Sequence, residues 1–216
     1  MHIQFWSLVA LLVVFPLSGD GQSIQPFYTA KDVVFKQQLL GKWDLGVPLE
    51  FRDAGNDTYG IDLFGDDGFV IHYRAHLIHI GQNYFLDVQT TAMEGPEKVT
   101  EQGSVKVQMG KDGPNEHYTL EKDDIFLNRH HGLILIEFTK NSDEFIGHLW
   151  EDGWLPQMAE KDKMHCPYIK DEMGRILLTG SSSQLRAFVE KLPLSAFDAG
   201  HTLTRMEAEQ ETDVVP

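Results

Sequence analysis

The alternation of apolar and polar residues predicts short β-strands over most of the chain. Turn-forming residues separate these segments, and Gly65-Asp66-Asp67-Gly68 between two of them is typical of a hairpin. The connections are short, so neighbouring strands should run antiparallel. The predicted strands include residues 59–64, 69–80, 125–129, 133–139, 145–150, 175–179 and 202–206.

Two segments have the pattern of helices instead. Residues 31–40 should form a short helix that ends at Gly41, which can adopt the left-handed conformation. Residues 181–192 place apolar side chains on one helix face, and Ser181 with Gln184 fits a capping box. The fold class is therefore mainly β, an antiparallel meander of about nine or ten strands that closes into a barrel, since closure removes exposed edges.

The beginning of the chain has the layout of a secretory signal peptide. A largely apolar run of 13 residues, 3–15, precedes Pro16 and the small residues Gly19 and Gly21. The run is too short to span a bilayer, which takes about 20 apolar residues. We predict a secreted or periplasmic protein with a signal peptide over 1–21, one domain over 22–206 and a disordered acidic tail over 207–216.

Acidic side chains dominate the composition, with 33 Asp and Glu against 18 Lys and Arg. Removal of the signal peptide would delete only Asp20 among them and leave a net charge of −14. Such a surface repels phosphate backbones and anionic lipids, so we expect no nucleic-acid partner and no membrane-surface role. We also expect no membrane insertion of the mature chain, because no later segment is apolar enough to span a bilayer. The single cysteine, Cys166, cannot form an internal disulfide. The sequence leaves the oligomeric state open.

Residues 70–81 contain three of the chain's ten histidines, His72, His76 and His79. On a helix these side chains would share one face and suggest a metal site, but the alternation predicts a strand. Residues four apart in a strand are separated by roughly 13 Å, whereas zinc needs nitrogen ligands at about 2 Å. One straight strand therefore cannot bring His72 and His76 to the same ion.

A turn at Gly81-Gln82 fixes how this strand pairs with the next one. In that register His76 lies opposite Asp87, and Leu77 lies opposite Leu86. A slip by one residue would place Leu77 against Asp87, so the hydrophobic pattern disfavours it. The register creates a polar cluster on one face of the ribbon, made of His72, Arg74, His76, Asp87 and Gln89.

This cluster has two interpretations. It is either a solvated sheet face, with cross-strand pairs that contribute about 0.2–1 kcal/mol each, or it points into the barrel. In the second case it would bind a polar or anionic small molecule, with Arg74 as the charged contact.

A divalent-metal site, with zinc as the ion, is an alternative function. The candidate ligands are His76, Asp87 and His117, although their spacing matches no recognised ligand motif. His130 and His131 lie at a predicted hairpin tip, where we expect them to be exposed.

A hydrolase that uses Ser182 or Cys166 is a third alternative, although we expect no catalytic residues. The segment 180–184 lacks the second glycine of a nucleophile elbow, and a helix cap explains it more simply. The neighbouring His165 does not by itself form a hydrogen-bonded pair with Cys166.

Gly41-Lys42-Trp43, which opens the first strand of the meander, resembles the glycine-x-tryptophan signature of lipocalin-like barrels. Residues 40–206 are also similar to a group of uncharacterised exported bacterial proteins. The shared landmarks are Tyr84-Phe85-Leu86-Asp87, His117, Asp152-Gly153-Trp154-Leu155 and Leu177-Leu178-Thr179-Gly180-Ser181-Ser182. Many members of that group carry a lipid-attachment cysteine after the signal, and this chain has none there.

The lipocalin resemblance implies a central cavity for a small ligand. Aromatic residues would line this cavity or fill the barrel; the candidates are Trp43, Tyr59, Tyr73, Tyr84 and Trp150. The resulting hypothesis is a non-enzymatic, exported small-molecule-binding or envelope-associated protein with a cavity of roughly 300 Å³ or more. Its candidate ligand-binding residues are His72, Arg74, His76, Asp87, Gln89, Trp43 and Tyr73.

Overall fold

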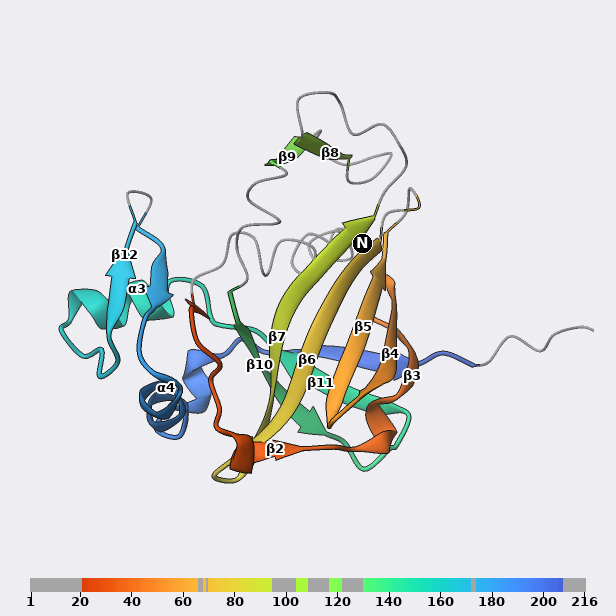
Figure 1. Ribbon diagram of the computed structural model, residues 1–216, viewed down its shortest axis with the longest axis horizontal. Helices are drawn as coiled ribbons and strands as arrows, with labels where there is room; N and C mark the ends of the chain where they lie inside the picture. The colour runs from red at the N-terminus through yellow and green to blue at the C-terminus, as the bar shows by residue number, and fades with distance from the viewer. Residues whose placement is uncertain are drawn as a thin grey trace, which may run out of the picture.

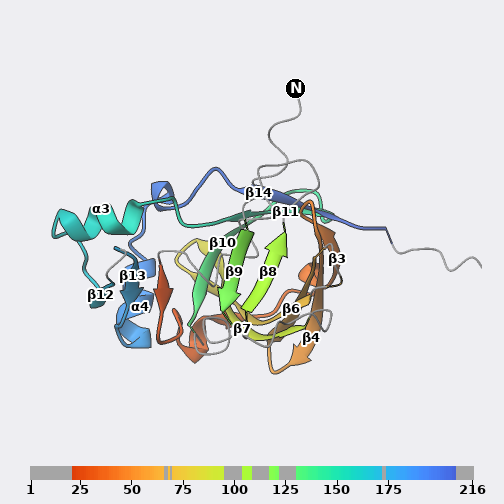
Figure 2. The ribbon, with the colours of Figure 1, turned by 90° about the horizontal axis from the view of Figure 1, so that it is seen from above.

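Eight antiparallel strands close into a barrel in the computed structural model of the protein (Figures 1 and 2). Residues 21–65, 68, 70–94, 104–108, 117–121, 130–171 and 174–207 are described, with the backbone alone for 104–108 and 117–121. The barrel strands are β3 (Gly41–Asp44), β4 (Pro48–Gly55), β5 (Thr58–Phe64), β6 (Val70–Ile80), β7 (Asn83–Glu94), β10 (Gly132–Phe138), β11 (Glu144–His148) and β14 (His201–Arg205).

Each barrel strand pairs with the next one along the chain, and β14 returns to pair with β3. The predicted mainly β fold, an antiparallel meander closed into a barrel, is therefore confirmed. Between β7 and β10, β8 (Ser104–Gln108) and β9 (His117–Glu121) form a separate antiparallel hairpin. The predicted strand 125–129, residues 1–20 of the predicted signal peptide and residues 208–216 of the predicted tail lie outside the described residues.

The N-terminal segment differs from the single helix expected over 31–40. Two short 3-10 turns, η1 (Ala30–Asp32) and η2 (Gln37–Leu39), lie on either side of β2 (Val33–Val34). The β-branched Val33 and Val34 favour strand geometry, and β2 pairs with Leu77 and Ile78 of β6, just beyond the residues of β6 that pair with the start of β5. Gly41 follows with a φ of 113°, in the positive region that was expected of it.

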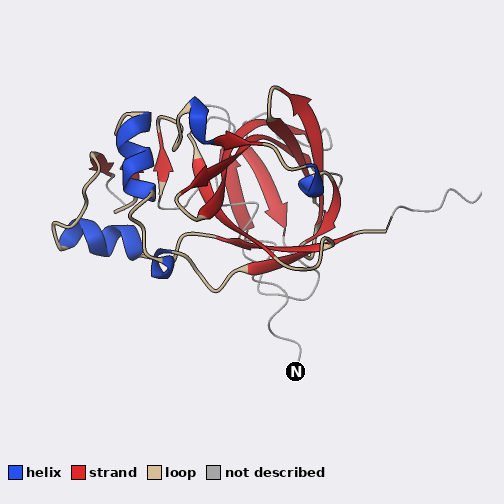
Figure 3. Ribbon diagram, turned by 90° about the horizontal axis from the view of Figure 1, so that it is seen from below, coloured by secondary structure: helices blue, strands red, loops and turns tan. Residues whose placement is uncertain are grey.

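A side layer covers one outer flank of the barrel (Figure 3). It contains α3 (Trp154–Glu160), α4 (Ser182–Val189), η3 (Leu194–Ala196) and a small sheet of β1 (Gln22–Ser23), β13 (Ile176–Leu178) and β12 (Tyr168–Lys170). The capping box of α4 is confirmed, because Ser181 N donates to Gln184 Oε1 and Gln184 N donates to Ser181 Oγ. None of the described helices combines the length and apolar character that a membrane span requires.

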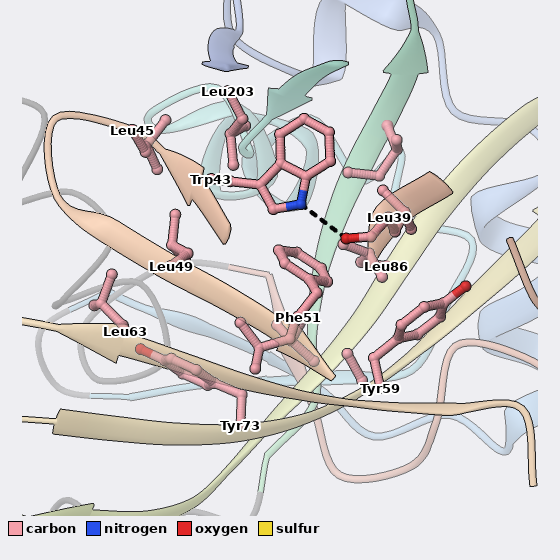
Figure 4. Close-up of a cluster of buried hydrophobic side chains, with 14 of the residues drawn as sticks. Leu39, Trp43, Leu45, Leu49, Phe51, Tyr59, Leu63, Tyr73, Leu86 and Leu203 are labelled. Atoms are coloured by element: carbon pink, nitrogen blue, oxygen red, sulfur yellow. Dashed lines mark hydrogen bonds between the residues drawn. The ribbon is translucent and has the colours of Figure 1, made fainter. Parts of the chain in front are cut away.

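The barrel wall separates two hydrophobic cores. Inside, Trp43, Phe51 and Phe145 pack edge to face, and Trp43 Nε1 donates to the Leu39 carbonyl at 2.8 Å (Figure 4). Outside, apolar residues of β6, β7 and β10 pack against the side layer; they include Ile78, Ile80, Phe85, Leu133 and Leu135. The wall is therefore buried on both faces where the side layer lies.

Arg205, the last residue of β14, joins the seam between the first and last barrel strands. Its guanidinium lies 4.3 Å from the Trp43 ring centroid and donates to the carbonyls of Gln38 and Leu40. This places a cation–π contact and two hydrogen bonds at the point of closure. The C-terminal strand is thereby attached to η2 as well as to β3.

Candidate functional site

A cavity of about 70 Å³ lies inside the barrel. Its walls come from seven of the barrel strands and from the segments next to them; the lining residues are Leu45, Leu49, Phe51, Ile61, Tyr73, Leu86, Val88, Ile134, Ile136, Phe145, Gly147, Leu149, His201 and Leu203. This volume is far below the expected 300 Å³, because large side chains fill much of the interior (Figure 4). A water molecule takes about 30 Å³ of liquid volume, so the cavity suits a very small molecule.

The cavity lies where the barrel interior lacks a side chain. Gly147 in β11 is directly opposite His201 in β14. Its φ lies outside the left-handed region, so the backbone does not require glycine there. A glycine inside a strand often marks a place where a ligand or another backbone approaches closely.

His201, at the start of β14, is oriented by a carboxylate. Its Nε2 lies 3.1 Å from Asp198 Oδ2, and the other carboxylate oxygen accepts hydrogen bonds from the backbone N–H groups of Leu149 and Gly200. His148 packs against this turn, with its Nδ1 3.1 Å from the Asp198 carbonyl oxygen. The arrangement fixes one polar ring at the edge of an otherwise apolar space.

The predicted pairing of β6 with β7 is confirmed. His76 lies opposite Asp87, Arg74 opposite Gln89, and Leu77 opposite Leu86, as the hydrophobic pattern required. A bulge beyond Tyr73 shifts the register only at the far end of the ribbon.

The polar face of this ribbon points away from the barrel interior. Ile71, Tyr73, Ala75 and Leu77 occupy the inner face and belong to the barrel core. Arg74 is exposed, Gln89 is half-buried, and His72 bonds Asp62 with its Nδ1 at 2.7 Å. The inward-facing interpretation of the polar cluster is therefore wrong: in these strands the large apolar side chains fill the interior.

Two members of the polar cluster are nevertheless covered, because the N-terminal segment crosses them. Asp87 is 2 % exposed; one of its oxygens accepts the Phe27 N–H at 2.9 Å, and the other lies 2.6 Å from His131 Nδ1. His131 also forms a β-bridge with Ser23. The exposed position expected for His131 is wrong, because it joins the N-terminal segment to the barrel wall.

His76 lies between two hydroxyl groups where the N-terminal segment crosses the barrel wall. The Tyr28 hydroxyl lies 2.9 Å from His76 Nδ1, and the Thr58 hydroxyl lies 3.1 Å from Nε2 and points its own proton at the Asn56 carbonyl. This leaves Nε2 as the donor and Nδ1 as the acceptor. Burial raises the pKa of Tyr28 to about 12, with Asp87 adding to the effect, and burial also lowers the pKa of His76.

No family model, curated protein or solved structure matches the chain. The lipocalin resemblance of Gly41-Lys42-Trp43 stays a prediction.

Among the candidate aromatic residues, only Tyr73 lines the cavity. Burial raises the pKa of Tyr73, so its phenol is neutral. Trp43 is 1 % exposed and packs against Phe145 and Arg205. Tyr59 binds the backbone of Lys36 through its hydroxyl group.

The remaining two aromatic candidates, Tyr84 and Trp150, lie away from the cavity. Tyr84 stacks on the exposed His79, while Trp150 stacks on Phe197 in the side layer. These residues fill cores or cover surfaces rather than line a ligand site.

The described residues contain no group of three His, Cys, Asp or Glu side chains that could hold a metal ion. Both ring nitrogens of His76 and both oxygens of Asp87 already have hydrogen-bond partners. The side chain of His117 lies outside the described residues, so the three-ligand zinc site stays a prediction.

The two candidate nucleophiles have surroundings that suit structural roles. Cys166 is buried, and this burial raises the pKa of its thiol, which opposes formation of a thiolate. His165 beside it is exposed. Ser182 is the first residue of α4, next to the capping serine. This geometry gives a hydrolase no support.

The sequence predictions did not select the residues that shape the cavity. Gly147 and Asp198 carried no motif, and His201 begins a strand that was expected only from residue 202. A glycine inside the apolar alternation Phe145-Ile146-Gly147-His148-Leu149 was the available signal. It could have marked the place where the barrel interior is not filled.

Proposed function

We propose that this is an exported binding protein that takes up a small, mainly apolar molecule inside its barrel. The observation that carries the proposal is the internal cavity of about 70 Å³, walled almost entirely by hydrocarbon side chains. An apolar cavity stays dry and gains dispersion contacts when a molecule fills it. Export is part of the proposal and rests on the apolar run at residues 3–15.

The volume limits the size of the ligand. An engineered cavity of about 150 Å³ binds benzene or xenon, so a cavity of half that size suits an occupant of a few non-hydrogen atoms. Larger molecules would have to displace packed aromatic rings such as Phe51 and Phe145, at a cost comparable to overpacking a core.

Methyl NMR with dissolved xenon tests the proposal, because leucine, isoleucine and valine methyl groups form most of the wall. In the wild type we expect shifts concentrated on these methyl groups, for example those of Leu203 and Ile134. Gly147→Val should abolish them, since the added side chain occupies the cavity.

Gly60→Val is the matched control. Gly60 is also a strand glycine without a left-handed φ, but it lies on the outer face, opposite Arg52 and Arg74. The xenon shifts should persist in this variant. Absence of xenon shifts in the wild type, or their persistence in Gly147→Val, would refute uptake by the barrel.

A further inference from the structure

The wall of the cavity is apolar except at two side chains. Among the described residues that line it, only Tyr73 and His201 carry polar side-chain atoms. His201 is on the same face of β14 as Leu203, which belongs to the barrel core. It therefore places an imidazole ring in the wall of the space.

The orientation of this imidazole is fixed by the carboxylate of Asp198. The Asp198 carboxylate can only accept, so His201 Nε2 is the donor in the 3.1 Å contact between them. Asp198 is itself held by the backbone N–H groups of Leu149 and Gly200. In neutral His201 this tautomer leaves Nδ1 with a lone pair, and no described residue donates a hydrogen bond to it.

The glycine opposite His201 supplies the room for a ligand. A Cβ at Gly147 would meet Ile134 and Leu203 at 3.6 Å, an ordinary van der Waals distance. Neither backbone strain nor a clash therefore accounts for a glycine here. An open space beside one hydrogen-bond acceptor is an arrangement that recognises a small apolar molecule with one polar group.

We propose that His201 is the polar anchor of the cavity, and that the ligand is a small apolar molecule with one hydrogen-bond donor, such as a short-chain alcohol or a five-membered N–H heterocycle. The donor binds His201 Nδ1, and the apolar body lies beside Gly147 against Leu203 and Ile134. Asp198 acts as a positioning residue that keeps the ring in the accepting tautomer. This inference rests on the proposed function and adds the chemical class of the ligand.

Pyrrole and furan form a matched pair of probes, because the small rings differ mainly in an N–H donor against an oxygen acceptor. Titrations with each probe are followed by the methyl shifts of Leu203 and Ile134. One added hydrogen bond should make pyrrole bind about three- to tenfold more tightly than furan in the wild type. His201→Leu should reduce this preference to about onefold.

His72→Leu is the control, since His72 also pairs with a carboxylate, that of Asp62, but on the outer face. It should keep the pyrrole preference. A readout on the wild type avoids dependence on any variant: the His201 Nδ1 nitrogen resonance should move with pyrrole and not with furan.

The outcomes separate the two proposals. Equal binding of both probes, or tighter binding of furan, would overturn the role of His201 while uptake by the barrel stands. A preference that survives in His201→Leu would do the same. If pyrrole, furan and xenon all leave the methyl shifts unchanged, both the anchor and the binding function are wrong.

Discussion

Two aspartate–histidine pairs lie on opposite sides of the barrel wall and face different surroundings. Asp87 and His131 are joined at 2.6 Å on the outer face, beneath the N-terminal segment. Asp198 and His201 are joined at 3.1 Å, and His201 lines the internal cavity. Both carboxylates also accept backbone N–H groups, so the local chemistry of the two pairs is alike.

What differs is the surroundings of each imidazole. His131 is packed under the protein's own chain, whose residue Ser23 bridges it, whereas His201 borders a space that no side chain fills. The comparison teaches that the paired residue types do not reveal whether a site is structural or functional. The decisive feature is the empty volume beside the second pair, which depends on Gly147.

The largest expected loss of stability comes from removing the buried carboxylate of the outer pair, Asp87 and His131. Asp87→Ala leaves the Phe27 N–H and His131 Nδ1 without their acceptor in a buried place, and should cost about 3 kcal/mol of unfolding free energy. Chemical denaturation measures the loss, and hydrogen exchange should show weaker protection near Phe27.

Asp62→Ala is the control on the same outer face. Its partners, Arg52 and His72, are 54 % and 25 % exposed and can turn to water, so the loss should stay near 1 kcal/mol. Equal losses in the two variants would mean that Asp87 is not a special attachment point.

The two histidines should respond differently to the same substitution. His131→Leu leaves one oxygen of the 2 %-exposed Asp87 unpaired, and should cost about 2 kcal/mol. His201→Leu should cost less than about 1 kcal/mol, because Asp198 is 22 % exposed and keeps its backbone donors. Thermal and denaturant unfolding of both variants provide the check, and a reversed order would contradict the structural assignment.

Acid should loosen the contact between the N-terminal segment and the barrel through His76. Burial, aided by Arg74 and His131 and opposed by Asp87 and Asp57, lowers its pKa, so the folded state binds its proton less readily than the unfolded state. The stability from neutral His76 is therefore fully present above its unfolded pKa of about 6.5 and is lost as the pH falls below that value toward the folded pKa.

Denaturation midpoints at about pH 7.5 and about pH 5.5 measure this effect. His76→Gln, which keeps a donor and an acceptor but does not titrate, should lose less stability than the wild type over that interval. Equal losses of stability in the wild type and in His76→Gln would show that groups other than His76 cause the pH dependence.

The smallest effect on stability is expected at Gly147. Gly147→Ala adds a methyl group at ordinary contact distance and restricts the unfolded chain, so stability should rise by about 0.4–1 kcal/mol. Xenon uptake should weaken in the same variant. A clear destabilisation would mean that the backbone needs glycine at this position.

The pairing of β6 with β7 and the cap of α4 could be predicted because both depend on local spacing. Leu77 must face Leu86 in that register, and Ser181 and Gln184 satisfy each other within one helical turn. The antiparallel order of β3 to β7, and of β10 with β11, followed from short connections, and closure was expected because it removes exposed edges.

The direction of the polar face and the partners of Asp87 depend on contacts between distant segments. Phe27 is 60 residues from Asp87, and His131 is 44 residues away. Consecutive apolar residues, such as Leu77-Ile78 and Phe85-Leu86, were the available signal for strands buried on both faces, and the sequence predictions did not use it. The volume of the cavity could not be predicted, because it depends on how individual rings pack.

Diffraction from crystals pressurised with xenon tests the central claim most directly. We predict one xenon site inside the barrel, between Gly147, Leu203 and Ile134, that is absent from crystals of Gly147→Val. A barrel interior without xenon, with xenon bound only in the side layer around Trp150, would contradict the assignment of the cavity as a binding site.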